Sequence, residues 1–270
     1  MFQFRVEISQ KWKQLPAEEK EQYVVTDRCG QSSVSEEELL ELVRIDTRCS
    51  PDRFRSLVAD FSDEKKAACS AIGFDVLLKM SGRKIHHSML RVLVDSVDPN
   101  ACTITMHGKK IEMDASDFEN VMGLKNAGSE VDFKGSTNDH PELMAIINSL
   151  CGKDNKINLR DVQNYMKDTE EVDNKFKRLF VLFTMSTILS PSASLTIPKK
   201  WLLALKDTRL ISSLNWADYS FKCLMEAIVS FKKESQSYCS GCVLFLQLFY
   251  FDCVSHGKTI VDKSLYPVEA

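Results

Sequence analysis

Apolar residues recur every three or four positions over most of this 270-residue chain, which is the spacing of amphipathic helices. From Ser50 the pattern is continuous, and the first helix of this part is predicted from Pro51, with Ser50 as its N-cap and the proline in its first turn. A second helix is expected over 63–80, capped by Ser62, and a third over 87–97.

The period changes between residues 102 and 113, where apolar and polar side chains alternate on both sides of a His-Gly-Lys turn. Alternation of this kind predicts a small β-hairpin at about 102–113. A short helix should follow, with Ser116 and Glu119 in capping-box spacing and Gly123 as its stop.

Helical spacing then resumes after a polar, glycine-containing stretch at 125–140 that is typical of an exposed loop. Asn215 is the expected cap of the longest of the remaining helices. These helices are predicted over 141–150, 159–166, 174–189, 198–207, 216–234 and 243–253. The sequence therefore predicts a mainly α, multi-helix globular domain with one small β-hairpin.

Polarity and spacing divide the chain into four segments. Residues 1–28 are expected to form two short helices, and residues 29–47 a polar linker with a further helix. Residues 48–256 are predicted to form the main helical domain, followed by a tail at 257–270.

Composition narrows the functional classes. Hydrophobic residues make up 44% and charged residues 27%, and the formal net charge is −3, so no global basic field attracts nucleic acid. The longest apolar runs are shorter than the ~20 residues that span a bilayer, so no membrane association is expected. The start of the chain lacks the apolar core of a secretory signal. The nine cysteines lie mostly in apolar runs and are expected to be free thiols in the nucleus or, alternatively, the cytoplasm.

Four residues have the spacing C-x2-C-x10-C-x2-H and are candidate zinc ligands: Cys239, Cys242, Cys253 and His256. The ten intervening residues, however, read as one buried helix. Such a helix would separate the two pairs by about 15 Å, too far for one ion. We therefore expect no metal site and no cofactor here.

Short basic clusters are the candidate contacts for nucleic acid, and they are Lys11, Lys13, Lys109, Lys110, Lys199 and Lys200. The last four would form a patch only if the fold gathered them on one side. Glycine-rich phosphate loops, HExxH and GxSxG are absent, and no residue is predicted to be catalytic or cofactor-binding.

Four blocks together resemble the plant mobile domain, a module of transposon-encoded proteins and of host proteins derived from them. The blocks are 48–80, 104–124, 177–207 and a closing pair, 215–234 with 241–252. The resemblance implies a non-enzymatic interaction module in nuclear mobile-element or silencing biology, with unknown protein partners. Although the family is sometimes called aminotransferase-like, no lysine stands in a cofactor-site context.

Two alternatives remain open. Residues 1–28 resemble the second helix and the start of the third helix of an HMG box, which would imply a chromatin protein that binds DNA. The first helix of that box is missing, and five basic residues are balanced by five acidic ones. Because the plant mobile domain often precedes a ubiquitin-like protease, the chain could also be an accessory fragment without the catalytic domain.

Overall fold

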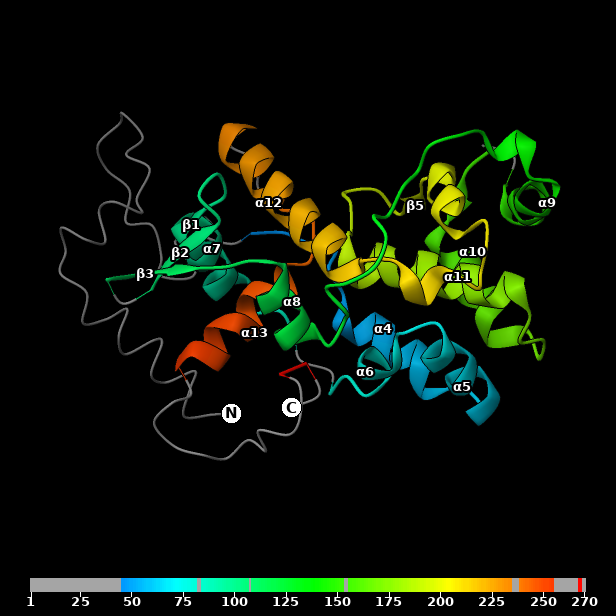
Figure 1. The fold of residues 1–270 in the computed structure, drawn as a ribbon, viewed down its shortest axis with the longest axis horizontal. Coiled ribbons are helices and arrows are strands. Elements are labelled where there is room, and N and C mark those ends of the chain that lie inside the picture. The colour runs from blue at the N-terminus through cyan, green and yellow to red at the C-terminus, as the bar shows by residue number, and fades with distance from the viewer. Residues whose placement is uncertain are drawn as a thin grey trace, which may run out of the picture. The chain divides into compact units, whose positions relative to one another are not determined.

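Helices form most of the chain in the computed structural model, as the apolar spacing predicts (Figure 1). The structure describes residues 45–81, 84–106, 108–152, 155–234, 238–254 and 267–268. The helices predicted within 1–28, most of 29–47 and most of the 257–270 tail lie outside these residues. The described part belongs to one unit, Ile45–Ala270.

The first described helices are α4 (Pro51–Ala59), α5 (Asp63–Ala71), α6 (Asp75–Leu78) and α7 (His87–Ser96). Ser62 caps α5 as predicted, because its hydroxyl accepts a hydrogen bond from the Lys65 N–H. Ser50 occupies the N-cap position of α4 but its side chain makes no capping bond. The prediction of one continuous helix over 63–80 is wrong, because α5 ends at Ala71 and a separate helix, α6, begins at Asp75. The break turns Phe74 into the core, against Phe180 and Trp216.

The predicted hairpin is confirmed and belongs to a three-stranded antiparallel sheet of β1 (Val97–Asp98), β2 (Thr103–Met106) and β3 (Lys109–Glu112). The two residues of β1 are too few to show alternation in the sequence. Helix α8 (Ala115–Met122) follows and ends at Gly123 as expected. Its cap is Asp114 and not Ser116, because the Asp114 carboxylate accepts from the Ser116 and Asp117 N–H groups.

The next part of the chain mixes α-helices with tighter and wider turns. It contains η1 (Thr137–Asp139), α9 (Pro141–Leu150), β4 (Ile157–Asn158), α10 (Leu159–Asp168), α11 (Asn174–Thr184), η2 (Met185–Leu189), β5 (Thr196–Ile197), η3 (Lys199–Leu205) and η4 (Ile211–Ser213). The helix predicted over 174–189 therefore changes at Thr184 into the π-helical η2. The segment predicted at 198–207 is a 3-10 helix, η3. Strands β4 and β5 pair antiparallel.

The last two helices are α12 (Trp216–Glu234) and α13 (Val243–Val254), as predicted. Asn215 caps α12 by accepting a hydrogen bond of 2.9 Å from the Asp218 N–H. Among the described residues, no helix has the length and apolar character needed to cross a bilayer.

Two groups of aromatic rings lie in the core. One surrounds Phe180 of α11, and the other joins Phe118 of α8, Phe221 of α12 and Phe245 of α13. Trp216, at the start of α12, contacts Phe74 of the first group, so α12 connects the two. This packing fixes the ends of α4, α10 and α11, where the candidate site lies.

Candidate functional site

The three candidate zinc ligands that the structure describes, Cys239, Cys242 and Cys253, do not lie together. Cys239 and Cys242 precede α13, whereas Cys253 lies near its other end, about 15 Å along the helix axis. In the described part of the chain, no three His, Cys, Asp or Glu side chains are placed to hold a metal ion. His256 lies outside the described residues.

The side chain of Cys242 instead contacts that of Cys49, a residue far from it in the sequence. The Cys239 N–H donates to the Asp46 carbonyl oxygen at 2.9 Å, and this contact places Cys49 beside the turn before α13. The side chains of Cys49 and Cys242 are hydrogen-bonded, and both are buried. Burial raises the pKa of Cys239 to about 12 and the pKa of Cys242 well above its ordinary value. These thiols stay protonated and act as small apolar side chains.

The raised pKa values predict the order in which the cysteine thiols react with an alkylating agent. A raised pKa leaves less thiolate at a given pH, and at about pH 8 the buried Cys69, Cys239 and Cys242 should resist alkylation by iodoacetamide. Cys102 and Cys151 are partly exposed and should react first. Peptide mapping by mass spectrometry after a timed reaction measures the order, and denatured protein is the control. Early labelling of Cys242 would contradict the buried arrangement.

The structure places the basic pairs at separate locations. Lys109 and Lys110 lie on β3, at the left of Figure 1, whereas Lys199 and Lys200 begin η3, directly after β5 at the right. The fold therefore does not gather the four lysines into one patch. Lys11 and Lys13 lie outside the described residues.

A surface cleft with both polar and apolar lining residues includes one of these lysines. It consists of two adjoining hollows, of about 300 and 200 Å³, that share Ser194. The larger one, the outer hollow, lies between β4 and the segment 192–199. The smaller one, the inner hollow, lies between the start of α4, the start of α10 and η2.

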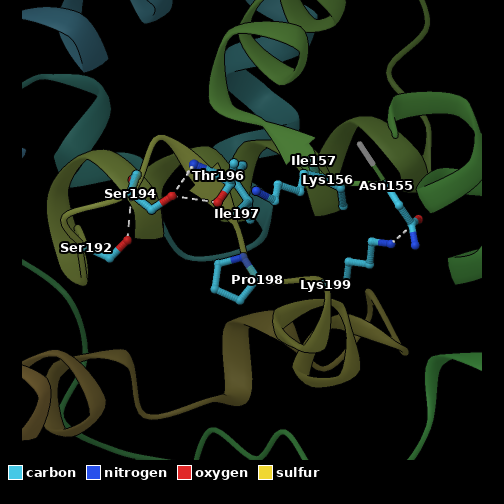
Figure 2. A pocket seen from close by; sticks show the side chains of 9 residues that line it. All are labelled: Asn155, Lys156, Ile157, Ser192, Ser194, Thr196, Ile197, Pro198 and Lys199. Atoms are coloured by element: carbon cyan, nitrogen blue, oxygen red, sulfur yellow. Dashed lines mark hydrogen bonds between the residues drawn. The ribbon is translucent and has the colours of Figure 1, made fainter. Parts of the chain in front are cut away.

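Hydroxyl groups and amines line the outer hollow (Figure 2). The Ser194 and Thr196 hydroxyl oxygens are 2.6 Å apart, and the Thr196 N–H donates to the Ser194 hydroxyl at 3.1 Å. On the opposite side, Lys199 donates to the Asn155 side-chain oxygen at 2.6 Å, while the Lys156 side chain extends towards Thr196 and Ile197. The Lys199 amine is thus held by a neutral amide, which an anion could replace.

Arginines line the inner hollow. Arg48 donates from Nε to the Ala193 carbonyl oxygen, and Arg53 from Nε to the Gln163 side-chain oxygen, each at 2.8 Å. Both partners are neutral. Burial and the neighbouring Arg160 guanidinium lower the pKa of Arg53. Two guanidinium groups therefore lie close enough to repel each other beside this hollow.

Within the described residues, none of the four cations Arg48, Arg53, Arg160 and Lys199 forms a salt bridge. Three carboxylates are close in sequence: Asp46 before Arg48, Asp52 in the first turn of α4 and Asp161 in that of α10. Asp161 accepts a hydrogen bond from the Asn158 amide instead of an arginine. The cleft therefore keeps an excess of positive charge, which favours an anionic ligand.

The π-helical turn η2 positions the inner hollow. Ser186 and Thr187 of this turn line it, and their hydroxyls donate to the Leu182 and Phe183 carbonyl oxygens at 2.8 and 2.7 Å. The Thr187 carbonyl oxygen accepts from the Ser50 N–H at 2.8 Å, which fixes the start of α4. Single π turns occur often at functional sites, where they redirect side chains.

Sequence reasoning found Lys199 but missed the other groups of the cleft. Arg48 and Arg53 have no directly adjacent basic residue, so no basic pair marks them in the sequence. The hydroxyl-rich run at 190–196 was the available signal, because serine and threonine often accompany arginine in phosphate sites. Chemically, the cleft offers cationic and hydroxyl donors, and no cluster of metal-ligating side chains lies in the described part of the chain.

Comparison with known proteins gives one match. No curated protein and no solved structure matches the chain. Residues 47–247, which include every residue that lines the cleft, match a protein family. The chain belongs to the family described as a domain of unknown function, DUF8566.

Proposed function

We propose that this chain is a non-enzymatic interaction module that binds the phosphate backbone of nucleic acid through the cleft. In line with its resemblance to the plant mobile domain, it acts in the nucleus, in mobile-element or silencing biology. The cations in the cleft that have no carboxylate partner within the described residues carry this proposal.

The chemistry of the lining supports a phosphate ligand over other anions. Guanidinium groups donate in pairs to phosphate oxygens, and serine and threonine hydroxyls are frequent phosphate contacts. Arg53, Ser194 and Lys199 supply a guanidinium, a hydroxyl and an ammonium donor in one cleft.

Replacing Arg48 and Arg53 by glutamine should weaken nucleic-acid binding by about tenfold or more at low salt. Each phosphate contact that is lost should also reduce the slope of log K against log salt by about one. Fluorescence anisotropy with labelled single- and double-stranded oligonucleotides, from about 50 to 200 mM KCl, measures both quantities.

The matched control is Lys109→Gln with Lys110→Gln, which removes the same charge from β3, away from the cleft. This variant should bind almost as the unmodified protein does. Equal losses in the two double variants would show that charge alone matters and not the cleft. No binding of either nucleic acid at the lowest salt would reject the proposed function.

A further inference from the structure

An exposed serine, Ser194, lies in the cleft beside two arginines. We propose that Ser194 is a phosphorylation site, and that its phosphate group binds Arg48 and Arg53 and displaces the anionic ligand of the cleft. The displacement rests on the proposed function, whereas the modification and its contacts with the arginines do not.

The first argument is the access that a protein kinase would have to this serine. Phosphoryl transfer needs the attacking oxygen in line with the γ-phosphate of ATP, so the serine must be able to enter the active site of the kinase. Ser194 is exposed and lies between η2 and β5, in no helix or strand. The other hydroxyl-bearing residues that line the cleft are partly or fully buried, and they are Thr47, Ser50, Ser186, Thr187, Ser192 and Thr196.

The second argument is that the hydrogen bonds of the Ser194 hydroxyl tolerate a phosphate group. The hydroxyl lies 2.6 Å from that of Thr196 and accepts from the Thr196 N–H at 3.1 Å (Figure 2). Phosphate oxygens accept hydrogen bonds from the same kinds of donor. The hydroxyls of Ser186 and Thr187 differ, because they donate to helix carbonyl oxygens and would lose those bonds on modification.

The third argument is the positive charge beside Ser194. Arg48 donates from Nε to the carbonyl oxygen of Ala193, the preceding residue, and Arg48, Arg53 and Ser194 line the same inner hollow. Within the described residues, these hydrogen bonds of Arg48 and Arg53 use the Nε donors, and both acceptors are neutral. A guanidinium group has further N–H donors, which match phosphate oxygens in geometry and charge.

The chemical step is an ordinary phosphoryl transfer from ATP, catalysed by a serine/threonine kinase. The Ser194 hydroxyl oxygen forms a bond to the γ-phosphorus of ATP, and the bond from that phosphorus to the bridging oxygen breaks. ADP leaves, and the hydroxyl proton passes to a base of the kinase. The product carries a charge of about −1.5 to −2 near neutral pH, enough to offset the two arginines.

The first experiment asks whether Ser194 is modified. The full chain is isolated from eukaryotic cells in the presence of phosphatase inhibitors, and phosphopeptides are quantified by mass spectrometry. Phosphate should be found on Ser194 and far less on Ser136, an exposed serine in the loop 125–140. Phosphate on Ser194 no more often than on Ser136 would overturn the inference.

The second experiment tests the contacts with the arginines in full chain that carries phosphoserine at position 194, inserted during translation. New charge-assisted hydrogen bonds should raise the melting temperature by about 2–4 °C. The second pKa of the phosphate group, followed by ³¹P NMR, should fall below its ordinary value of about 6, because nearby guanidinium groups favour the dianion. The double variant Arg48→Gln, Arg53→Gln should abolish both effects, and phosphoserine at position 136 should show neither.

The third experiment measures nucleic-acid binding by fluorescence anisotropy at about 50 mM KCl. Phosphoserine at position 194 should weaken binding of a labelled oligonucleotide by about tenfold or more, whereas phosphoserine at position 136 should have little effect.

The outcomes separate the inference from the proposed function. An unchanged melting temperature together with an ordinary phosphate pKa would overturn the inference. Equal binding by the unmodified and the Ser194-phosphorylated protein would also overturn it and leave the proposed function in place. If the unmodified protein binds no nucleic acid, while phosphorylation still raises the melting temperature through Arg48 and Arg53, the proposed function is rejected and the phosphate contacts are supported.

Discussion

Phe180→Ala is expected to lower the free energy of unfolding by about 3–5 kcal/mol, the usual cost of truncating a buried phenylalanine. Phe180 is fully buried on α11, and its ring centroid lies 6.1 Å from that of Phe54, 6.2 Å from that of Phe61 and 5.8 Å from that of Phe74. Alanine would leave a cavity where α4, α5 and the turn before α6 meet α11. Urea denaturation followed by circular dichroism measures the change.

Phe251→Ala is the matched control. This phenylalanine lies near the end of α13, is only partly buried, and contacts Tyr250. Because folding removes less apolar surface from water at this position, the decrease in the free energy of unfolding should be clearly smaller than for Phe180→Ala. A similar midpoint shift for both variants would contradict the central position of Phe180 in the core.

Gly128→Ala is expected to destabilise the fold by more than the roughly 1–3 kcal/mol of backbone strain alone. Gly128 has a φ of +106°, and an added Cβ would lie 2.0 Å from the Ser213 carbonyl oxygen. That oxygen accepts the hydrogen bond of the Ser129 N–H at 2.8 Å. Alanine would therefore push the segment after α8 away from η4 and from the start of α12. Thermal melting reports the loss.

Gly135→Ala separates the two causes. Its φ of +112° is nearly the same, but an added Cβ would have no heavy atom within 4 Å. It should cost only the backbone strain, so the difference between the two variants isolates the close approach to Ser213. Equal destabilisation would show that the contact with Ser213 contributes nothing.

The described helices follow local rules that the sequence displays. Ser62 and Asn215 cap their helices as predicted, and Gly123 ends α8. Where the helix bounds predicted from the sequence were wrong, a tertiary contact determined where the helix ends or changes form. The predicted helix 63–80 breaks so that Phe74 can enter the core, and the C-terminal end of α11 widens into η2, whose Thr187 carbonyl receives the Ser50 N–H.

The cysteines show the same difference between what local sequence determines and what tertiary packing determines. Their spacing suggested zinc, and the apolar residues between them predicted a helix, which the structure confirms. The sequence could not reveal that Cys242 pairs with Cys49, because no local pattern relates positions so far apart in the chain.

Taken alone, the sequence determined the mainly α class, most helix positions and the hairpin, because these depend on spacing within a few residues. Only the tertiary structure decided where the cleft lies. Arg48 and Arg53 lie with Ser194 around one hollow because the start of α4, the start of α10 and η2 meet there. Long-range packing creates that proximity, and local periodicity carries no information about it.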